Sequence, residues 1–290
     1  MNQRIAIVTP SFARDFILAR DLNESVMRYL PPDSRHYLIV DRQDLKLFRQ
    51  LENSRTIVAA VEDIIPWGFF KISKRWWFGL QPMMPAKGWL VQQLVKLSAA
   101  NFVEEPVMVN VDSDVRFIRN VDTSMFMKDG KVRMYRQPNG ILPGMIHVKW
   151  HKNICKLLDV QPESIPTDDY VGNVISWNRK IVIDACKRIE SVTGRPWYVD
   201  YTRYGSVAEQ LTYGLYVDKV IGQEAAGVWV DERSWCHTYW GPGPLGADDV
   251  DTFVAQLQED DVAFSIAGYT DSAAEVVDRA LKLVMARSGG

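Results

Sequence analysis

Apolar and polar positions in the first half of the chain follow two alternating periodicities. Residues 5–9 form a short apolar run with the length of a buried strand, and residues 36–40 and 56–61 repeat that pattern. Residues 14–29 instead space their apolar side chains like an amphipathic helix, and a second helical stretch surrounds Leu45. This β-α-β-α-β order predicts an α/β fold with a mixed, mostly parallel sheet and helices on both faces.

The carboxyl ends of these strands are expected to carry the functional residues, because open parallel sheets bind ligands beyond those ends. Thr9-Pro10-Ser11 ends the first run, and Asp41 follows the second, where it is placed to cap the next helix. The strongest later strand, residues 106–111, delivers Asp112-Ser113-Asp114 to the same edge. We therefore expect these three segments, together with Glu62-Asp63 after the third strand, to lie on the working edge of the sheet.

Composition limits the classes of function. The chain has 290 residues, of which 47% are hydrophobic and 24% charged, which suits one large folded domain. A formal net charge of -2 argues against a general nucleic-acid binder, so we expect no nucleic-acid partner. The 3 cysteines are far apart and form no CxxC pair, and no run approaches the roughly 18 apolar residues of a membrane span. We expect a cytoplasmic protein.

Asp112 and Asp114 are the strongest candidates for chemistry. Two carboxylates at i and i+2 on a turn after a buried strand can share a hard divalent ion, Mg²⁺ or Mn²⁺, with a diphosphate. Such an ion acts as a Lewis acid when a sugar-phosphate bond breaks and charge develops on the diphosphate. The alternative interpretation of this acidic pattern is a solvated turn.

Several motifs in a shared order resemble a known family. The opening Ile7-Val8-Thr9-Pro10-Ser11-Phe12 looks like the start of bacterial GT-A nucleotide-diphospho-sugar transferases. More specifically, the chain is similar to a largely uncharacterised family of bacterial sugar transferases over about residues 4–240. The motifs that carry this likeness are Gly88-Trp89 with Gln92-Gln93-Leu94-Val95-Lys96, then Asp112-Ser113-Asp114, Tyr170-Val171, Trp177 and Glu209-Gln210-Leu211-Thr212-Tyr213-Gly214. One departure is Ala208, where that family usually has a serine.

The resemblance implies a GT-A fold that binds a nucleotide-diphosphate sugar. Thr9, Pro10 and Ser11 would then meet the base and ribose, and Asp112 would contact the donor, directly or through the metal. Asp114 would bind the metal, with His237 as a third ligand; the alternative for His237 is a structural or acceptor-contacting role. The donor pocket would also be lined by side chains of the helix predicted over residues 87–102, namely Gln92, Gln93 and Lys96; the alternative for these is a solvated helix face.

The resemblance leaves the catalytic base open. Glu209 is the first candidate for deprotonating an acceptor hydroxyl, and Asp168 and Asp169 are the second; the alternative for that pair is a turn or cap after Pro166. His147 and His151 stand at i and i+4 of a predicted helix, but no glutamate follows His147, so the metalloprotease pattern fails. We interpret them as structural or substrate-contacting.

A long aromatic and basic loop is predicted between residues 64 and 88. Loops of this length in compact domains are usually lids, binding loops or disordered segments. Residues 67–78 have three candidate roles: a lid over the donor, an acceptor-binding wall, or a patch for peripheral contact with an anionic membrane. The alternative is partial burial of these side chains in the core. We divide the single domain, residues 1–290, into a nucleotide-binding half (1–118), an acceptor-binding and catalytic half (119–246) and a closing helical segment (247–290).

These observations favour a metal-dependent glycosyltransferase that moves a hexose or related sugar to a glycan, a lipid-linked molecule or a small-molecule hydroxyl. The family resemblance implies a role in bacterial polysaccharide or glycolipid synthesis, in the cytoplasm or at the inner face of the membrane. A nucleotidyltransferase is the first alternative, although residues 9–14 lack the glycine-rich loop of such enzymes. A non-catalytic nucleotide-sugar-binding module and a haloacid dehalogenase-like phosphatase are the others.

Overall fold

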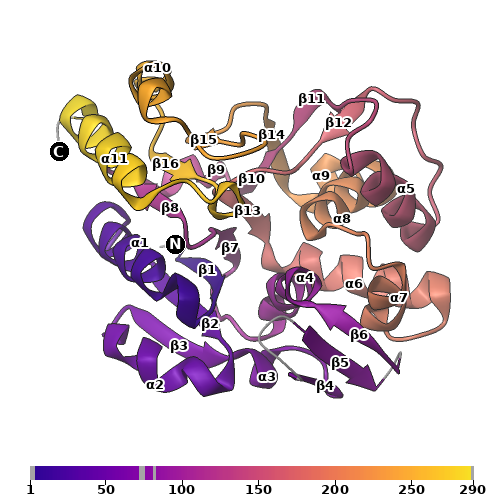
Figure 1. Cartoon of the computed structure of the whole chain (residues 1–290). Coiled ribbons are helices and arrows are strands. Elements are labelled where there is room, and N and C mark those ends of the chain that lie inside the picture. The colour runs from indigo at the N-terminus through magenta and orange to yellow at the C-terminus, as the bar shows by residue number, and fades with distance from the viewer. Residues whose placement is uncertain (1–3, 72–75, 81–82, 289–290) are drawn as a thin grey trace.

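A central five-stranded sheet organises the protein (Figure 1). The computed structural model describes residues 4–71, 76–80 and 83–288. From one edge to the other the sheet runs β13 (Ile175–Asn178), β7 (Val107–Asn110), β1 (Ile5–Ser11), β2 (Arg35–Val40) and β3 (Thr56–Ala60). All neighbouring strands are parallel except β13, which runs antiparallel to β7. The predicted α/β class with a mixed, mostly parallel sheet is confirmed.

Helices cover both faces of this sheet because its strands are apolar on both sides. Leu38 of β2 packs with Ala19 and Phe48 on one face, whereas the neighbouring Ile39 belongs to the main core. The helices are α1 (Phe16–Tyr29), α2 (Leu45–Phe48), α3 (Val61–Ile64), α4 (Gly88–Ser98), α5 (His147–Leu158), α6 (Arg179–Thr193), α7 (Trp197–Tyr204), α8 (Glu209–Tyr216), α9 (Gln223–Ala226), α10 (Val250–Ala255) and α11 (Ala274–Ser288).

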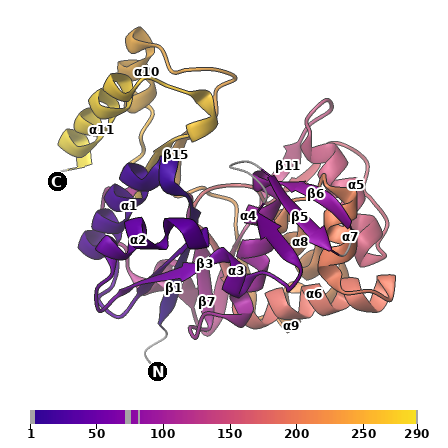
Figure 2. The ribbon, with the colours of Figure 1, turned by 60° about the horizontal axis from the view of Figure 1, so that its bottom comes forward.

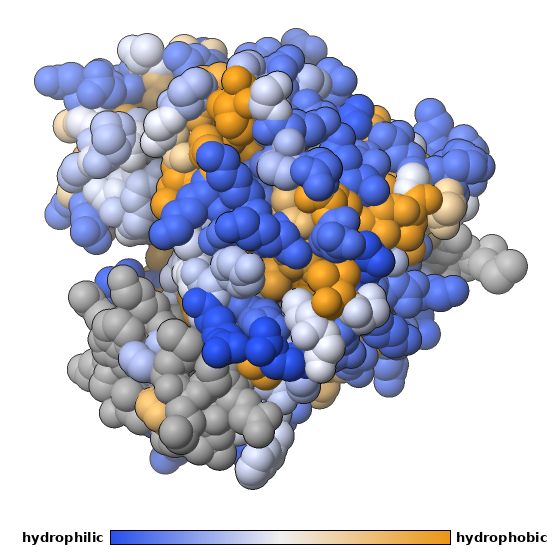
Figure 3. All heavy atoms as spheres, turned by 90° about the vertical axis from the view of Figure 1, so that its right-hand side faces the viewer, coloured by the Kyte–Doolittle hydropathy of each residue, from blue (hydrophilic) through white to orange (hydrophobic). Residues whose placement is uncertain are grey.

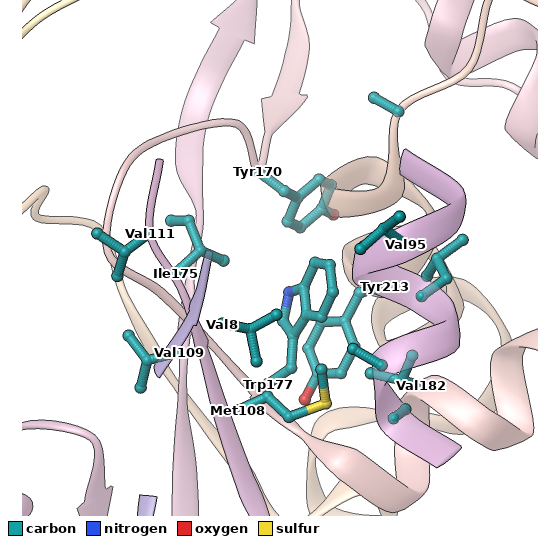
Figure 4. Close-up of a cluster of buried hydrophobic side chains, with 14 of the residues drawn as sticks. Val8, Val95, Met108, Val109, Val111, Tyr170, Ile175, Trp177, Val182 and Tyr213 are labelled. Carbon is teal, nitrogen blue, oxygen red and sulfur yellow. The ribbon is translucent and has the colours of Figure 1, made fainter. Parts of the chain in front are cut away.

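The main core lies between the central sheet and helices α4, α6 and α8 (Figure 4). Trp177 of β13 stacks on Tyr213 of α8 with ring centroids 5.5 Å apart. Val8 of β1 and Met108 of β7 lie around this pair in Figure 4. The core therefore holds α8 against the same strands that end at the acidic turn.

The segment predicted as a loop between residues 64 and 88 is instead a small antiparallel sheet. It consists of β4 (Phe69–Lys71), β5 (Trp76–Leu80) and β6 (Met83–Lys87). Its order is stabilised by burial of Phe69 and Trp77 in the main core, where Phe69 also meets Tyr198 edge to face. Trp67 just before it is 88% exposed. Residues 72–75 of the proposed 67–78 patch lie outside the described residues.

Asp41 does not cap the following helix as predicted. Its carboxylate forms an ion pair with Lys71 of β4 and makes no hydrogen bond to the turn that follows it. The interaction with an ammonium group from a distant strand replaces the local cap, because a charged partner binds a partly buried carboxylate more strongly than an amide does.

The C-terminal part of the chain returns to the acidic turn. Strand β16 (Ala263–Ile266) pairs with β15 (Cys236–Tyr239) and, in antiparallel register, with β8 (Val115–Phe117), which directly follows Asp114. Helices α10 and α11 pack on this sheet in a cluster of their own, and lie on the side of the molecule opposite α5 and α7 (Figures 1 and 2). The end of the chain thereby covers one side of the acidic turn.

The remaining strands form two smaller sheets. They are β9 (Met127–Lys128), β10 (Lys131–Tyr135) and β14 (Val228–Asp231) in one, and β11 (Gln137–Ile141) with β12 (Thr167–Asp169) in the other. Among the described residues, no helix has the length and apolar composition needed to cross a membrane.

Candidate functional site

The acidic turn follows β7 and presents two carboxylates in different environments. The side chain of Asp112 is 50% exposed, whereas Asp114 is enclosed by the C-terminal segment. Gly268 donates its backbone N–H to Asp114 Oδ2 at 2.7 Å, and Ser265 donates its hydroxyl to Oδ1 at 3.3 Å. Burial and, after it, the neighbouring charge of Asp112 together raise the pKa of Asp114 to about 6, although its hydrogen bonds to Gly268 and Ser265 act in the opposite direction. Sequence reasoning missed Ser265 and Gly268, since no local motif marks them.

A buried lysine joins this turn to helix α8. The Nζ atom of Lys96, on α4, lies 3.0 Å from Asp112 Oδ1 and 3.1 Å from Glu209 Oε1. Burial by itself lowers the pKa of Lys96, but the two carboxylates raise it to a net value above the usual one. The ammonium group is therefore charged, and three of the predicted site residues form one ionic network.

Gln93 holds the first residue of α8 in place. Ala208 is the N-cap of that helix and has no side-chain oxygen to offer. The Gln93 side chain accepts a hydrogen bond from the Glu209 backbone N–H at 3.0 Å instead. An amide from a neighbouring helix thus satisfies the first free N–H of α8. Gln92, also predicted to line the donor pocket, is only partly buried on the same helix.

The end of β1 adjoins the acidic turn. Thr9, Pro10 and Ser11 are buried in this strand. Ser113 donates its hydroxyl to Ser11 Oγ at 2.9 Å, which fastens the turn to β1. Thr9 Oγ1 lies 3.1 Å from Nε2 of His36, and burial lowers the pKa of this histidine to about 3.

His237 lies on β15 and packs into the C-terminal cluster. Its ring stacks on Phe253 at 4.4 Å, and its Nε2 is 2.8 Å from the Phe253 carbonyl oxygen. In residues 4–71, 76–80 and 83–288, no three His, Cys, Asp or Glu side chains are grouped to hold a metal. A metal that used His237 would have to bind through Nδ1, so its role as a ligand stays a prediction.

Asp112 and Asp114 nevertheless fit a divalent cation. The two carboxylates repel each other enough to contribute to the raised pKa of Asp114, and a bound cation would remove that repulsion. Carboxylate oxygens, together with phosphate oxygens and water, are the ligands that Mg²⁺ and Mn²⁺ prefer. Asp112 and Asp114 would hold the ion, with the half-exposed Asp112 nearer to solvent.

Asp168 and Asp169 belong to a second network. Asp169 Oδ2 lies 2.7 Å from Nδ1 of His147, and its Oδ1 accepts the backbone N–H groups of Tyr170 and Val171 at 2.8 and 3.1 Å. Asp168 pairs with Arg136 at 3.5 Å. Within the described part of the chain, no hydrogen bond or ion pair joins this network to Lys96.

In the sequence, His147 was noted only for its i, i+4 spacing from His151. His151 is buried and lies 3.8 Å from the sulfur of Cys155, and burial lowers its pKa. His147 instead finds its partner in Asp169, 22 residues away. This pair can be recognised only in the structure, because the two residues are close in space but distant in sequence.

Both networks are fastened to α8. Gln210 of that helix exchanges two hydrogen bonds with the backbone of Gly172, at 2.9 and 3.0 Å. Tyr170 packs directly on Gly214 and donates its hydroxyl to Asp218 at 2.7 Å. Helix α8 thus carries Glu209 at its start and positions the segment that holds Asp169.

Solved structures with a similar arrangement include two glycosyltransferases. One is mouse xyloside xylosyltransferase 1 in its apo form, with 12% identity and a TM-score of 0.47, covering 90% of this chain and 97% of that chain. The other is the galactosyltransferase LgtC in complex with donor and acceptor sugar analogs, with 13% identity and a TM-score of 0.48, covering 97% of this chain and 95% of that chain.

Sequence comparisons place the chain in a family. A search of curated proteins gives no match. One family's sequence model matches residues 4–240, which is most of the chain and includes β1, the acidic turn and α8. The protein belongs to the Family of unknown function (DUF6492).

Proposed function

We propose that the protein is a metal-dependent glycosyltransferase that uses a nucleotide-diphosphate sugar. The observation that carries this proposal is the network in which Lys96 bridges Asp112 and Glu209, beside Asp114. It stands where β7 of a mostly parallel sheet ends, the usual place for a ligand in such folds. The proposal extends the resemblance of the sequence motifs to GT-A transferases.

The donor would lie along the ends of β1 and β7. Thr9, Pro10 and Ser11 would face the nucleotide, and Asp112 and Asp114 would hold Mn²⁺ or Mg²⁺ against its diphosphate. The metal would supply Lewis-acid stabilisation of the charge that develops on the leaving diphosphate. Lys96 adds a fixed positive charge near the same oxygens, with Gln92 one helical turn before it.

Transfer breaks the bond between the anomeric carbon and the diphosphate oxygen and forms a bond to the acceptor oxygen. The nucleoside diphosphate leaves, and the acceptor hydroxyl gives up its proton. Glu209 is the first candidate to receive that proton or to stabilise the reacting sugar, because Lys96 links it directly to Asp112. Asp169 with His147, and Asp168, are the second, because their network borders α8 from the other side.

The acceptor would be a glycan, a lipid-linked molecule or a small-molecule hydroxyl, and a hexose is the expected donor sugar. Bacterial polysaccharide or glycolipid synthesis in the cytoplasm is the setting that the sequence resemblance suggests. Residues 1–118 would bind the nucleotide, residues 119–246 the acceptor, and residues 247–290 close the domain. The hydrogen bonds of Ser265 and Gly268 to Asp114 support such a closing role.

The test is a thermal-shift panel of UDP-, GDP-, CMP- and dTDP-sugars, each with and without Mn²⁺. A ligand that binds the native state raises its melting temperature according to its occupancy. We expect one donor class to stabilise the wild type in a metal-dependent way and not to stabilise Asp114→Asn. The exposed Asp248→Asn serves as the control, since it removes the same charge outside the site.

The outcomes separate the rival functions. Release of a nucleoside diphosphate from the stabilising donor supports transfer or hydrolysis of the sugar, whereas release of pyrophosphate from a nucleoside triphosphate indicates a nucleotidyltransferase. Binding without any release across an acceptor panel indicates a non-catalytic module. No shift with any nucleotide, or the same shift in Asp114→Asn as in the wild type, overturns the assignment of the donor site.

A further inference from the structure

Helix α5 and the turn before it form a surface that the donor site does not use. Three large apolar side chains are exposed in the turn: Leu142 at 51%, Met145 at 36% and Ile146 at 54%. Three exposed lysines follow on the helix: Lys149, Lys152 and Lys156. We call these six residues the basic-apolar patch. Figure 3 shows the side of the molecule that carries α5, with apolar areas among hydrophilic side chains.

The lysines share one face of α5. Positions 149, 152 and 156 are spaced at i, i+3 and i+7, which places them along one stripe of the helix. The opposite face is core, since Ile154, Cys155 and Leu158 are buried. A shallow groove of about 560 Å³ runs beside the stripe, lined by Met145, Ile146, Val148, Asn153, Gly144 and the three lysines. Apolar and cationic groups therefore border one open depression.

These lysines carry positive charge that the folded protein leaves unneutralised. None of the three forms an ion pair within the described residues, whereas Lys131 pairs with Glu224 and Lys219 with Glu163. Asp159, the next acidic residue along the chain after α5, pairs with Arg188. Because the whole chain has a formal net charge of -2, this cluster of cations is a local feature.

The patch is connected to the helix that carries Lys96. Trp150 of α5 stacks on Trp89 of α4 with ring centroids 5.3 Å apart, and on His147 at 4.5 Å. Trp89 is 40% exposed and stands seven residues before Lys96, or roughly 10 Å along the helix axis. The turn with the exposed apolar side chains also follows directly on β11, the partner of the strand that contains Asp169.

We propose that the basic-apolar patch binds the surface of an anionic lipid bilayer. The apolar side chains of the turn would enter the boundary between headgroups and acyl chains, and the lysines would lie against the anionic headgroups. An indole at the edge of such a surface, here Trp89, suits the same boundary. The positive charge of the three lysines favours an anionic lipid surface over a neutral apolar partner. Bound this way, α4 and the Asp169 strand would both lie near the membrane, where a lipid-borne molecule could reach them.

The experiment is co-sedimentation of the purified full chain with vesicles, without any nucleotide sugar. Phosphatidylcholine vesicles are compared with phosphatidylcholine–phosphatidylglycerol vesicles. We expect binding only to the anionic vesicles, and a loss of about 100-fold in partitioning for Lys149→Ala/Lys152→Ala/Lys156→Ala, given the contribution of each lysine near an anionic surface. High salt should weaken the wild-type interaction, because it screens exposed charges.

Two further variants make the result specific. Lys128→Ala/Lys180→Ala/Lys187→Ala removes the same number of exposed lysines elsewhere and should bind as the wild type does. Ile146→Asp tests insertion of the turn and should weaken binding while the three lysines remain. Equal binding to both vesicle types, or equal loss in the two triple variants, overturns the proposal. Since no donor is present, neither outcome depends on whether the protein is a glycosyltransferase.

Discussion

The Nζ atom of Lys96 lies 3.1 Å from the carboxylate of Glu209, and both side chains are more than nine-tenths buried. This contact ties α4 to α8, and the second carboxylate partner of the lysine, Asp112, extends it to the end of β7. Three elements that are distant in sequence thus meet at one ammonium group. A buried pair of this kind is expensive to break, because removing one partner leaves the other charge without compensation.

Replacement of this lysine should therefore destabilise the protein even without ligand. We expect Lys96→Met to lower the free energy of unfolding by about 3–5 kcal/mol, the usual cost of leaving a buried charge unpaired. The double variant Lys96→Met/Glu209→Gln should recover part of that loss, since it removes the stranded carboxylate. Urea denaturation of the three proteins measures both effects. If the double variant were less stable than Lys96→Met, loss of the Lys96–Glu209 ion pair would not be the cause of the destabilisation.

His36 should make the stability of the protein sensitive to mild acid. Its pKa is lowered from 6.5 to about 3 in the folded protein, first by burial and then by the charge of Arg55. The unfolded chain therefore binds the proton first, so stability that is present above pH 6.5 is lost as the pH falls toward 3. The loss has a limiting slope of about 1.4 kcal/mol per pH unit.

The variant His36→Gln isolates this contribution. Glutamine can still donate to Asn23 and accept from Thr9, the two partners of the imidazole ring, but it does not titrate. Unfolding measured between pH 7 and pH 5 should give a shallower decline for the variant. Parallel curves for the two proteins would show that His36 is not the group responsible.

Gly214 should not tolerate a methyl group. A Cβ atom there would lie 2.2 Å from ring carbons of Tyr170, far inside contact distance. Although alanine favours helices, we expect Gly214→Ala to destabilise the protein by about 1–3 kcal/mol through overpacking. Gly243→Ala is the matched control, because a Cβ atom there meets nothing within 4 Å. Similar melting temperatures for both variants would contradict this packing.

The cap that Gln93 provides for α8 should be replaceable. Gln93→Ala removes the acceptor of the Glu209 N–H and should cost about 1 kcal/mol, as the loss of a helix cap usually does. Ala208→Ser in the same background adds an N-cap oxygen that can accept from the second or third N–H of the helix, and it should return part of that stability by satisfying another free N–H. Chemical denaturation of the two variants is the measurement, and an unchanged stability after Gln93→Ala would argue against the capping role.

Local periodicity was sufficient to predict several elements. The helix predicted to carry His147 and His151 is α5, and the strand expected over residues 106–111 contains β7. The small sheet of β4, β5 and β6 was not predicted, because crowded aromatic side chains look alike whether they line a loop or fill a core. Only the contact of residues such as Phe69 with Tyr198 distinguishes the two cases.

The sequence by itself determined the class of the sheet and the placement of Asp112 and Asp114 at its carboxyl edge. Both follow from the hydrophobic periodicity of short segments and from the alternation of strands and helices along the chain, which can be read locally. Tertiary structure alone decided the partners of the charged groups. Lys96 meets Glu209, Asp114 accepts from Gly268, and Asp169 meets His147. A polar side chain can take many partners of complementary charge or hydrogen-bonding capacity, and the packing of the whole core determines which of them comes within reach.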